Sequence, residues 1–219
     1  MVFGLWKLVP FVKIYNFQFA GKLSKTKNRK LQKDGMNMKK YNNEFVEAFV
    51  TALNNSFSSL KKTYDEHFYY YAFIFDEGLH PYISAWSYEA LEKSIIDNKI
   101  TDEDKDWWKW DYSDSPYAVY GYDEFFCEVK ALLDEREKGL SIDELYGNEW
   151  DIRVSSMEEA MKRLDQIGFF GTGDERENVV INVEIAPPDG NEYDRALRLN
   201  PKSSLLLEYL KYCEQLEND

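Results

Sequence analysis

The chain has few of the side chains from which most metal-binding and acid–base sites are built. Its 219 residues include only two cysteines, Cys127 and Cys213, and two histidines, His67 and His80. No CxxC or HxxxH spacing occurs. The sequence therefore predicts no metal, no cofactor and no histidine-based catalysis. We expect both cysteines to be small buried residues in a reducing cytoplasm, with a disulfide or a metal pair as the alternative.

Motifs for nucleotide binding and serine hydrolysis are also absent. The chain contains no GxSxG and no GxxxxGK[ST] sequence, the patterns expected of a nucleophile elbow and a phosphate-binding loop. Residues 171–173 (GTG) have some likeness to a phosphate loop, but a helix is predicted before them and a strand after them. Two acids, Asp174 and Glu175, follow directly where a phosphate would approach. We interpret this segment as a turn.

Long apolar runs are missing as well. The first twenty residues are the most apolar, but Lys7, Pro10 and Lys13 interrupt them, well short of the roughly 20 apolar residues that a spanning helix needs. A basic, polar stretch follows over residues 22–33 and is typical of disorder. We predict that residues 1–37 are a basic extension, disordered or translated from an over-early start. A membrane-associating leader is the alternative.

Positive charge is scarce outside this extension. Residues 1–35 carry eight Lys or Arg against one acid, Asp34, and sum to +7. Because the whole chain carries −13, residues 36–219 carry −20. Such a body repels nucleic acid and anionic membranes but attracts a basic protein surface. We therefore predict a protein partner, and neither nucleic acid nor membrane binding for the folded body.

The body does contain regular hydrophobic patterning. Apolar residues at helical spacing follow Asn42, and the unbroken aromatic run Phe68–Asp76 predicts a central strand covered on both faces. Pro81–Ser87 is the second strand of a hairpin. Residues 178–186 alternate, which predicts a half-buried strand. Its expected inward residues are Ile181, Val183 and Ile185, and its expected outward residues are Asn182 and Glu184.

Further elements complete a predicted α+β fold. We expect one domain over residues 38–219, with an antiparallel sheet of about four to five strands packed by amphipathic helices. The pair Ser155 and Glu158 has the spacing of a capping box and predicts a helix start, and Ile167 is expected to be in that helix's apolar stripe. The other predicted helices cover residues 88–98, 122–138, 141–144 and 203–216, and a short extended piece is expected at 196–199.

The least regular segment, residues 101–121, holds the candidate binding residues. It has three tryptophans within four positions, and they cannot all be buried on one side of a helix or strand. Exposed Trp and Tyr among acids are typical of a hot spot for a basic partner. Core packing and carbohydrate stacking are the alternatives. The candidate partner-binding residues are Asp104, Asp106, Trp107, Trp108, Trp110, Asp111, Tyr112 and Asp114.

Four segments of the body carry a family resemblance: YYYAFIFDEGLHPYISAWS (69–87), DSPYAVYGYDEFF (114–126), MEEAMKRLDQIGFFGTGDERENVVINVEIAPPD (157–189) and RALRLNP (195–201). They resemble a bacterial family called domain of unknown function 4303. The resemblance implies a small cytosolic bacterial protein and brings no established active site with it. In size, acidity and α+β character such families are similar to immunity proteins that neutralise toxins, which is an analogy.

Three functions follow from these observations. The leading hypothesis is a non-enzymatic acidic cytosolic binding protein, an immunity-type inhibitor of a basic bacterial toxin domain. The first alternative is a carboxylate-based hydrolase or carbohydrate-active enzyme that pairs Asp76 or Glu77 with Asp111 across a cleft. The second alternative is a structural or scaffolding module.

Overall fold

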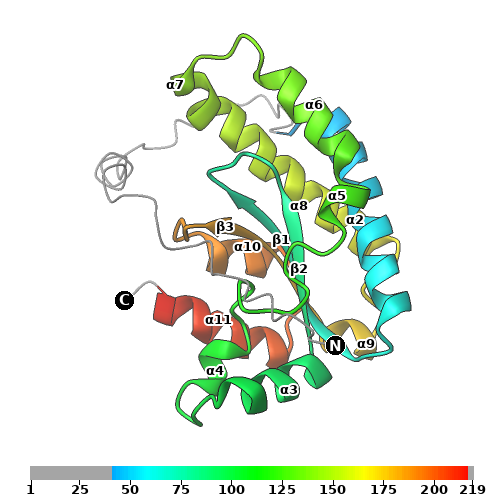
Figure 1. The fold of residues 1–219 in the computed structure, drawn as a ribbon, viewed down its shortest axis with the longest axis vertical. Coiled ribbons are helices and arrows are strands. Elements are labelled where there is room, and N and C mark those ends of the chain that lie inside the picture. Colours follow the sequence, from blue (N-terminus) through cyan, green and yellow to red (C-terminus); the bar gives the residue numbers. More distant parts are fainter. Residues whose placement is uncertain (1–40, 217–219) are drawn as a thin grey trace, which may run out of the picture. The chain divides into compact units, whose positions relative to one another are not determined.

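The computed structural model describes residues 41–216, which form an α+β fold around a mixed three-stranded sheet (Figure 1). The predicted extension, residues 1–37, lies outside the described residues. The strand order is β2-β1-β3, with β1 at Phe68–Asp76, β2 at Tyr82–Ser87 and β3 at Val180–Ala186. β1 pairs antiparallel with β2 and parallel with β3. The central position predicted for Phe68–Asp76 is therefore confirmed.

Helices surround this sheet on both faces. They differ widely in length, from single turns to the 21 residues of α2. In chain order they are α2 (Asn43–Thr63), α3 (Tyr88–Asn98), α4 (Lys105–Trp108), α5 (Tyr122–Phe125), α6 (Cys127–Glu137), α7 (Ile142–Glu144), the π-helical turn η1 (Leu145–Glu149), α8 (Trp150–Gln166), α9 (Asp174–Glu177), α10 (Glu192–Leu199) and α11 (Ser204–Leu216).

The prediction of four to five antiparallel strands is wrong for the described residues. The sheet there has three strands, and the parallel pairing of β1 with β3 makes it mixed. Residues 196–199, expected to be extended, form the end of α10. Ala196 and Leu199 are both buried, and their spacing of three places them on one helix face. The chain between β1 and β3 is long enough for the crossover that parallel strands need.

The pleat of β1 sends alternate aromatic rings into two separate layers of the core. On one face, Tyr71 meets Phe57 of α2 with 4.9 Å between ring centroids, and Phe75 meets Trp150 of α8 at 4.5 Å. On the other face, Tyr70 packs on Tyr209 of α11 at 5.5 Å. Helices α2 and α8 therefore cover one face, and α11 lies on the other.

Two predicted helices have different boundaries in the structure. The helix expected over residues 122–138 is split at Phe126, which has φ −105° and ψ 6° and is buried against Phe73. The helix expected to start at Ser155 begins five residues earlier, at Trp150. The Ser155 hydroxyl donates to the carbonyl of Asp151 inside that helix, because a Ser–Glu spacing of three also occurs within helices. Ile167, expected to be in the apolar stripe, is exposed.

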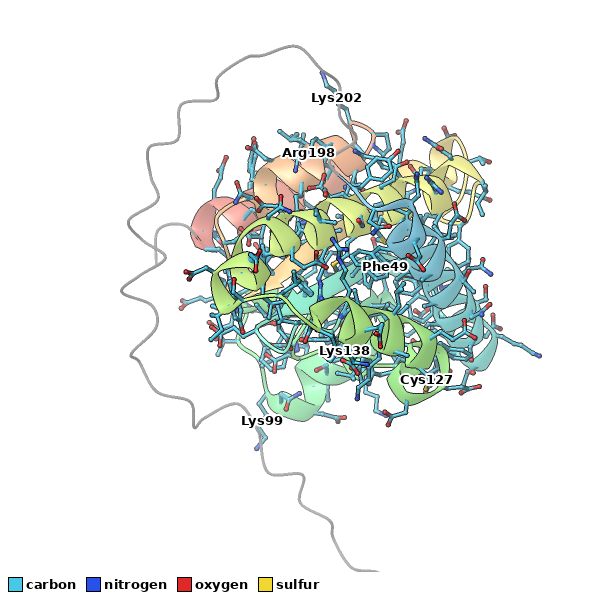
Figure 2. The ribbon with its side chains drawn as sticks, turned by 90° about the horizontal axis from the view of Figure 1, so that it is seen from above. Phe49, Lys99, Cys127, Lys138, Arg198 and Lys202 are labelled. Carbon is cyan, nitrogen blue, oxygen red and sulfur yellow. The ribbon has the colours of Figure 1, made fainter. Side chains whose placement is uncertain are left out.

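Other local predictions are confirmed. Helix α7 begins with a complete capping box between Ser141 and Glu144, and α3 and α11 start within one residue of their predicted positions. Of the two cysteines, Cys213 is buried as expected, whereas Cys127 is exposed at the start of α6 (Figure 2). Both are free thiols. Within residues 41–216, no helix combines the length and apolarity needed to cross a bilayer.

Candidate functional site

Trp110, one of the candidate partner-binding residues, belongs to the core. It is only 2% exposed, and its ring meets Tyr70 and Tyr209 edge-on at 5.6 and 5.2 Å between centroids. Such aromatic contacts are favourable and fill the layer between α11 and the sheet. The expectation of an exposed Trp110 is therefore wrong, because a ring at this depth cannot reach a partner.

The other two tryptophans are half-buried and have packing partners. Trp107 meets Tyr212 of α11 at 5.1 Å between ring centroids. The indole Nε1 of Trp108 donates to the hydroxyl of Ser94 on α3 over 3.0 Å. These contacts attach the short helix α4 to α11 and α3. Core packing, one of the alternatives, thus accounts for much of the tryptophan cluster.

Residues 111 and 112 lie across the same face of the sheet. The backbone carbonyl of Asp111 accepts from Trp86 Nε1 over 2.7 Å, and that of Tyr112 accepts from Ser84 Oγ over 2.8 Å. The Asp111 carboxylate turns back to the amide of Ser113 over 2.8 Å. The remaining candidates, Asp104, Asp106 and Asp114, are exposed carboxylates at the edges of this segment.

The carboxylates proposed for the hydrolase alternative stabilise their own turns. Asp76 Oδ1 accepts from the amide of Gly78 over 2.8 Å at the β1–β2 turn, just as Asp111 accepts from Ser113. Glu77 is exposed. No hydrogen bond within the described residues joins Asp76 or Glu77 to Asp111.

A buried polar cluster, built around the single carboxylate of Glu184, packs next to Trp110. The sequence did not predict it. Glu184 of β3 is 3% exposed, and its Oε1 accepts from Tyr70 Oη over 2.5 Å, from Tyr209 Oη and from Asn182 Nδ2 over 3.1 Å. The pKa values of Tyr70 and Tyr209 are raised well above 10. Burial of the phenols is the larger cause, and the nearby charge of Glu184 is the second. Both phenols therefore act as hydrogen-bond donors.

The outward orientation predicted for Asn182 and Glu184 is wrong because β3 is covered on both faces. Parallel strands are commonly buried in this way, and the alternation of β3 separates a polar buried face from an apolar one. Tyr70 and Tyr209 are the signal that could have indicated a buried acceptor, because the hydroxyls of buried tyrosines need hydrogen-bond partners. Asn182 Oδ1 is fully buried and accepts no hydrogen bond from the described residues.

A second polar network adjoins Glu184 at the start of α10. Arg195 is 2% exposed and donates to both Asp189 oxygens over 2.8 and 2.9 Å and to Glu192 Oε1 over 3.2 Å. Burial raises the pKa of Glu192 to about 7, against the opposing effect of Arg195. The hydrogen bond and charge of Arg195 lower the pKa of Asp189 in spite of its partial burial.

This network predicts a pH dependence of stability. Glu192 binds a proton more tightly in the folded than in the unfolded chain, so its contribution to the free energy of unfolding falls as pH rises from about 4.5 to about 7. We expect Glu192→Gln to flatten the stability profile in that window. Urea unfolding between pH 5 and pH 8 measures this, and an unchanged slope in the variant would contradict the assignment.

The arrangement of His80, Asp134 and Glu137 has the composition of a candidate metal centre. Their ligand atoms lie within 4.8 Å of one another. However, His80 Nε2 already contacts Asp134 Oδ1 at 2.6 Å, and Glu137 Oε1 accepts from the buried guanidinium of Arg153 over 2.9 Å. A metal cation would face that guanidinium charge directly. The arrangement is that of a histidine–carboxylate hydrogen bond beside an arginine–glutamate ion pair, and it does not fit a metal.

An acidic surface with exposed apolar side chains is present at α7. We define the α7 face as Ile142, Asp143, Glu144 and Tyr146, with Ile142 73% and Tyr146 48% exposed. The Tyr146 ring stacks near Trp150, 6.2 Å between centroids. Gly147, with φ −113° and ψ −106°, interrupts the helix here. Residues 122–151 contain ten acids and three bases.

These features define an acidic α+β protein with a buried polar cluster and an acidic, partly apolar face. It belongs to the family described as domain of unknown function (DUF4303), which it matches over residues 51–201. The match includes all three strands, and it confirms the resemblance found in the sequence. No curated protein and no solved structure matches the chain.

Proposed function

We propose that this protein is a non-enzymatic, acidic binding protein of the cytoplasm, an immunity-type inhibitor that binds a basic bacterial toxin domain. The observation that carries the proposal is the α7 face, where exposed Ile142 and Tyr146 lie among carboxylates. Apolar or aromatic anchors within a charged surface are what a protein interface uses for affinity and for steering. Among the described residues, exposed acids are more than twice as numerous as exposed bases.

The α7 face suits a partner better than the tryptophan segment does. Ile142 is largely exposed, and Tyr146 is about half exposed although it contacts Trp150 and the carbonyl of Glu77. Trp107 and Trp108 are less exposed and pack on α11 and α3. Helices α7 and α4 lie at opposite ends of Figure 1, so one compact partner domain would not cover both. The free thiols Cys127 and Cys213 agree with a reducing compartment.

A charge reversal tests the proposed surface. The probe is a basic toxin domain recovered from the native host by pull-down with the full chain, and the measurement is its association with the full chain by surface plasmon resonance. We expect Asp143→Lys with Glu144→Gln, which keeps an acceptor for the capping box with Ser141, to weaken binding about 10- to 100-fold. We expect Ile142→Ala to raise the dissociation rate at least about fivefold. Raising the salt concentration should slow association of the unaltered protein.

The matched control changes two carboxylates of the predicted tract, Asp104→Asn with Asp106→Lys. Both are exposed, and the change in net charge is the same as at α7. We expect the control to alter affinity less than about threefold, because it acts only on long-range attraction. An equal loss in both variants would remove the α7 face as the docking surface. Absence of any complex, together with no protection of growth against the co-expressed toxin, would overturn the proposed function.

A further inference from the structure

A hollow of about 340 Å³ lies at the start of β1 and is lined in part by Glu175 of α9. This volume is at the lower end of the range for small-ligand sites. Its apolar wall is aromatic and its rim is charged. The residues that matter for a ligand are Lys61, Glu66, Phe68, Tyr71, Phe170 and Glu175.

Tyr71 gives this hollow a polar group without a partner. The residue is 3% exposed and its ring is fixed by Phe57 and Phe170, at 4.9 and 5.2 Å between centroids. No described residue hydrogen-bonds to its hydroxyl. The neighbouring tyrosines differ, because Tyr69 Oη donates to the carbonyl of Lys109 over 2.7 Å and Tyr70 Oη donates to Glu184. Buried phenols normally find such partners.

The rim carries charges of both signs. Lys61 Nζ lies 5.2 Å from the centroid of the Phe169 ring. Glu66 uses Oε2 for Tyr117 Oη, over 2.6 Å, and for Ser87 Oγ, which leaves Oε1 available. The Glu175 side chain has no ion pair or hydrogen bond with any described residue. The carboxylates of Glu66 and Glu175 would repel a simple anion, and the ammonium group of Lys61 would repel a simple cation.

We propose that this hollow binds a free aromatic α-amino acid that carries a ring hydroxyl, of the tyrosine class. The ligand ring would pack on Phe68 and Phe170, its hydroxyl would bond to Tyr71, and its ammonium and carboxylate groups would meet Glu175 and Lys61. A zwitterion satisfies both signs of charge at the rim. The aromatic wall matches an aromatic ring. This site is distinct from the α7 face and does not depend on the toxin partner.

The preference for the ring hydroxyl tests the assignment. Isothermal titration of the full chain with L-tyrosine and with L-phenylalanine should show tighter binding of L-tyrosine by about three- to tenfold, the effect of one net hydrogen bond. Tyr71→Phe should abolish that preference while leaving L-phenylalanine affinity within about twofold. Because the hydroxyl has no partner, the variant should also keep its unfolding midpoint.

Two controls separate the roles of the ring and the charges. Tyr69→Phe removes a neighbouring hydroxyl that points to Lys109 and should keep the preference for L-tyrosine. Tyramine lacks the carboxylate and p-cresol lacks both charges, so both should bind at least about fivefold more weakly than L-tyrosine. Equal binding of p-cresol, an unchanged preference in Tyr71→Phe, or no binding of L-tyrosine at millimolar concentration would each overturn the proposal.

Discussion

Replacing Glu184 with leucine is expected to lower the free energy of unfolding by about 3–5 kcal/mol. The carboxylate accepts hydrogen bonds from Tyr70, Tyr209 and Asn182. A leucine would leave two phenols and an amide without that acceptor inside the layer between α11 and the sheet. Each unsatisfied buried donor costs about 1–3 kcal/mol, so the sum exceeds what the added apolar side chain returns.

Urea unfolding followed by tryptophan fluorescence measures this loss, because Trp110 lies against Tyr70 and Tyr209. Glu184→Gln is the matched control, since its carbonyl oxygen retains one acceptor in a side chain of the same shape. We expect the glutamine variant to lose less than half as much stability as the leucine variant. Equal losses would show that the charge of Glu184, and not its role as an acceptor, stabilises the cluster.

The sequence predicts the local elements well where a single pattern decides them. The inner residues of Phe68–Asp76 are all aromatic or aliphatic, a composition typical of a strand buried on both sides. Ser141 and Glu144 form a capping box that needs no tertiary partner. In contrast, the alternation of β3 predicts exposure for Asn182 and Glu184, because the pattern cannot show that α10 and α11 bring further polar groups to them.

The candidate site was harder to predict for the same physical reason. The composition of residues 104–114 correctly indicates acids beside aromatic rings, but exposure depends on what packs against each ring. Trp110 is buried because Tyr70 and Tyr209, which are 139 positions apart, meet beside it. Tyr71, in turn, lies in an unbroken aromatic run. Only the fold distinguishes its unpartnered hydroxyl from those of Tyr69 and Tyr70.

The buried arginines of this acidic protein are all paired with carboxylates, an arrangement that the net charge alone does not predict. Arg153, Arg176 and Arg195 are each buried, and each lies against at least one carboxylate. Three buried glutamates, Glu149, Glu184 and Glu192, match these arginines in number, so their burial leaves the formal net charge of the outer surface unchanged. Each arginine also donates to backbone carbonyls of neighbouring elements. These residues thus act as internal connections between segments far apart in the chain.

Arg153→Met is expected to be the most destabilising substitution of this kind, with a loss of about 3–5 kcal/mol in the free energy of unfolding. The guanidinium is 0% exposed and donates to the carbonyls of Leu79 and Leu133 and to the carboxylates of Glu137 and Glu149. It therefore connects the β1–β2 hairpin, α6 and α8. Among residues 41–216, its removal leaves the buried carboxylate of Glu149 with Arg136 as its only side-chain partner.

Two further variants isolate that buried charge. Arg136→Ala removes the other partner of Glu149, but its side chain is 47% exposed, so we expect a loss below about 1 kcal/mol. Adding Glu149→Leu to Arg153→Met removes the uncompensated carboxylate and should recover at least about 1–2 kcal/mol. Thermal and urea unfolding of the four proteins measure these differences. If the double variant is no more stable than Arg153→Met, the loss arises from the bonds to Leu79 and Leu133, and the buried charge of Glu149 contributes little.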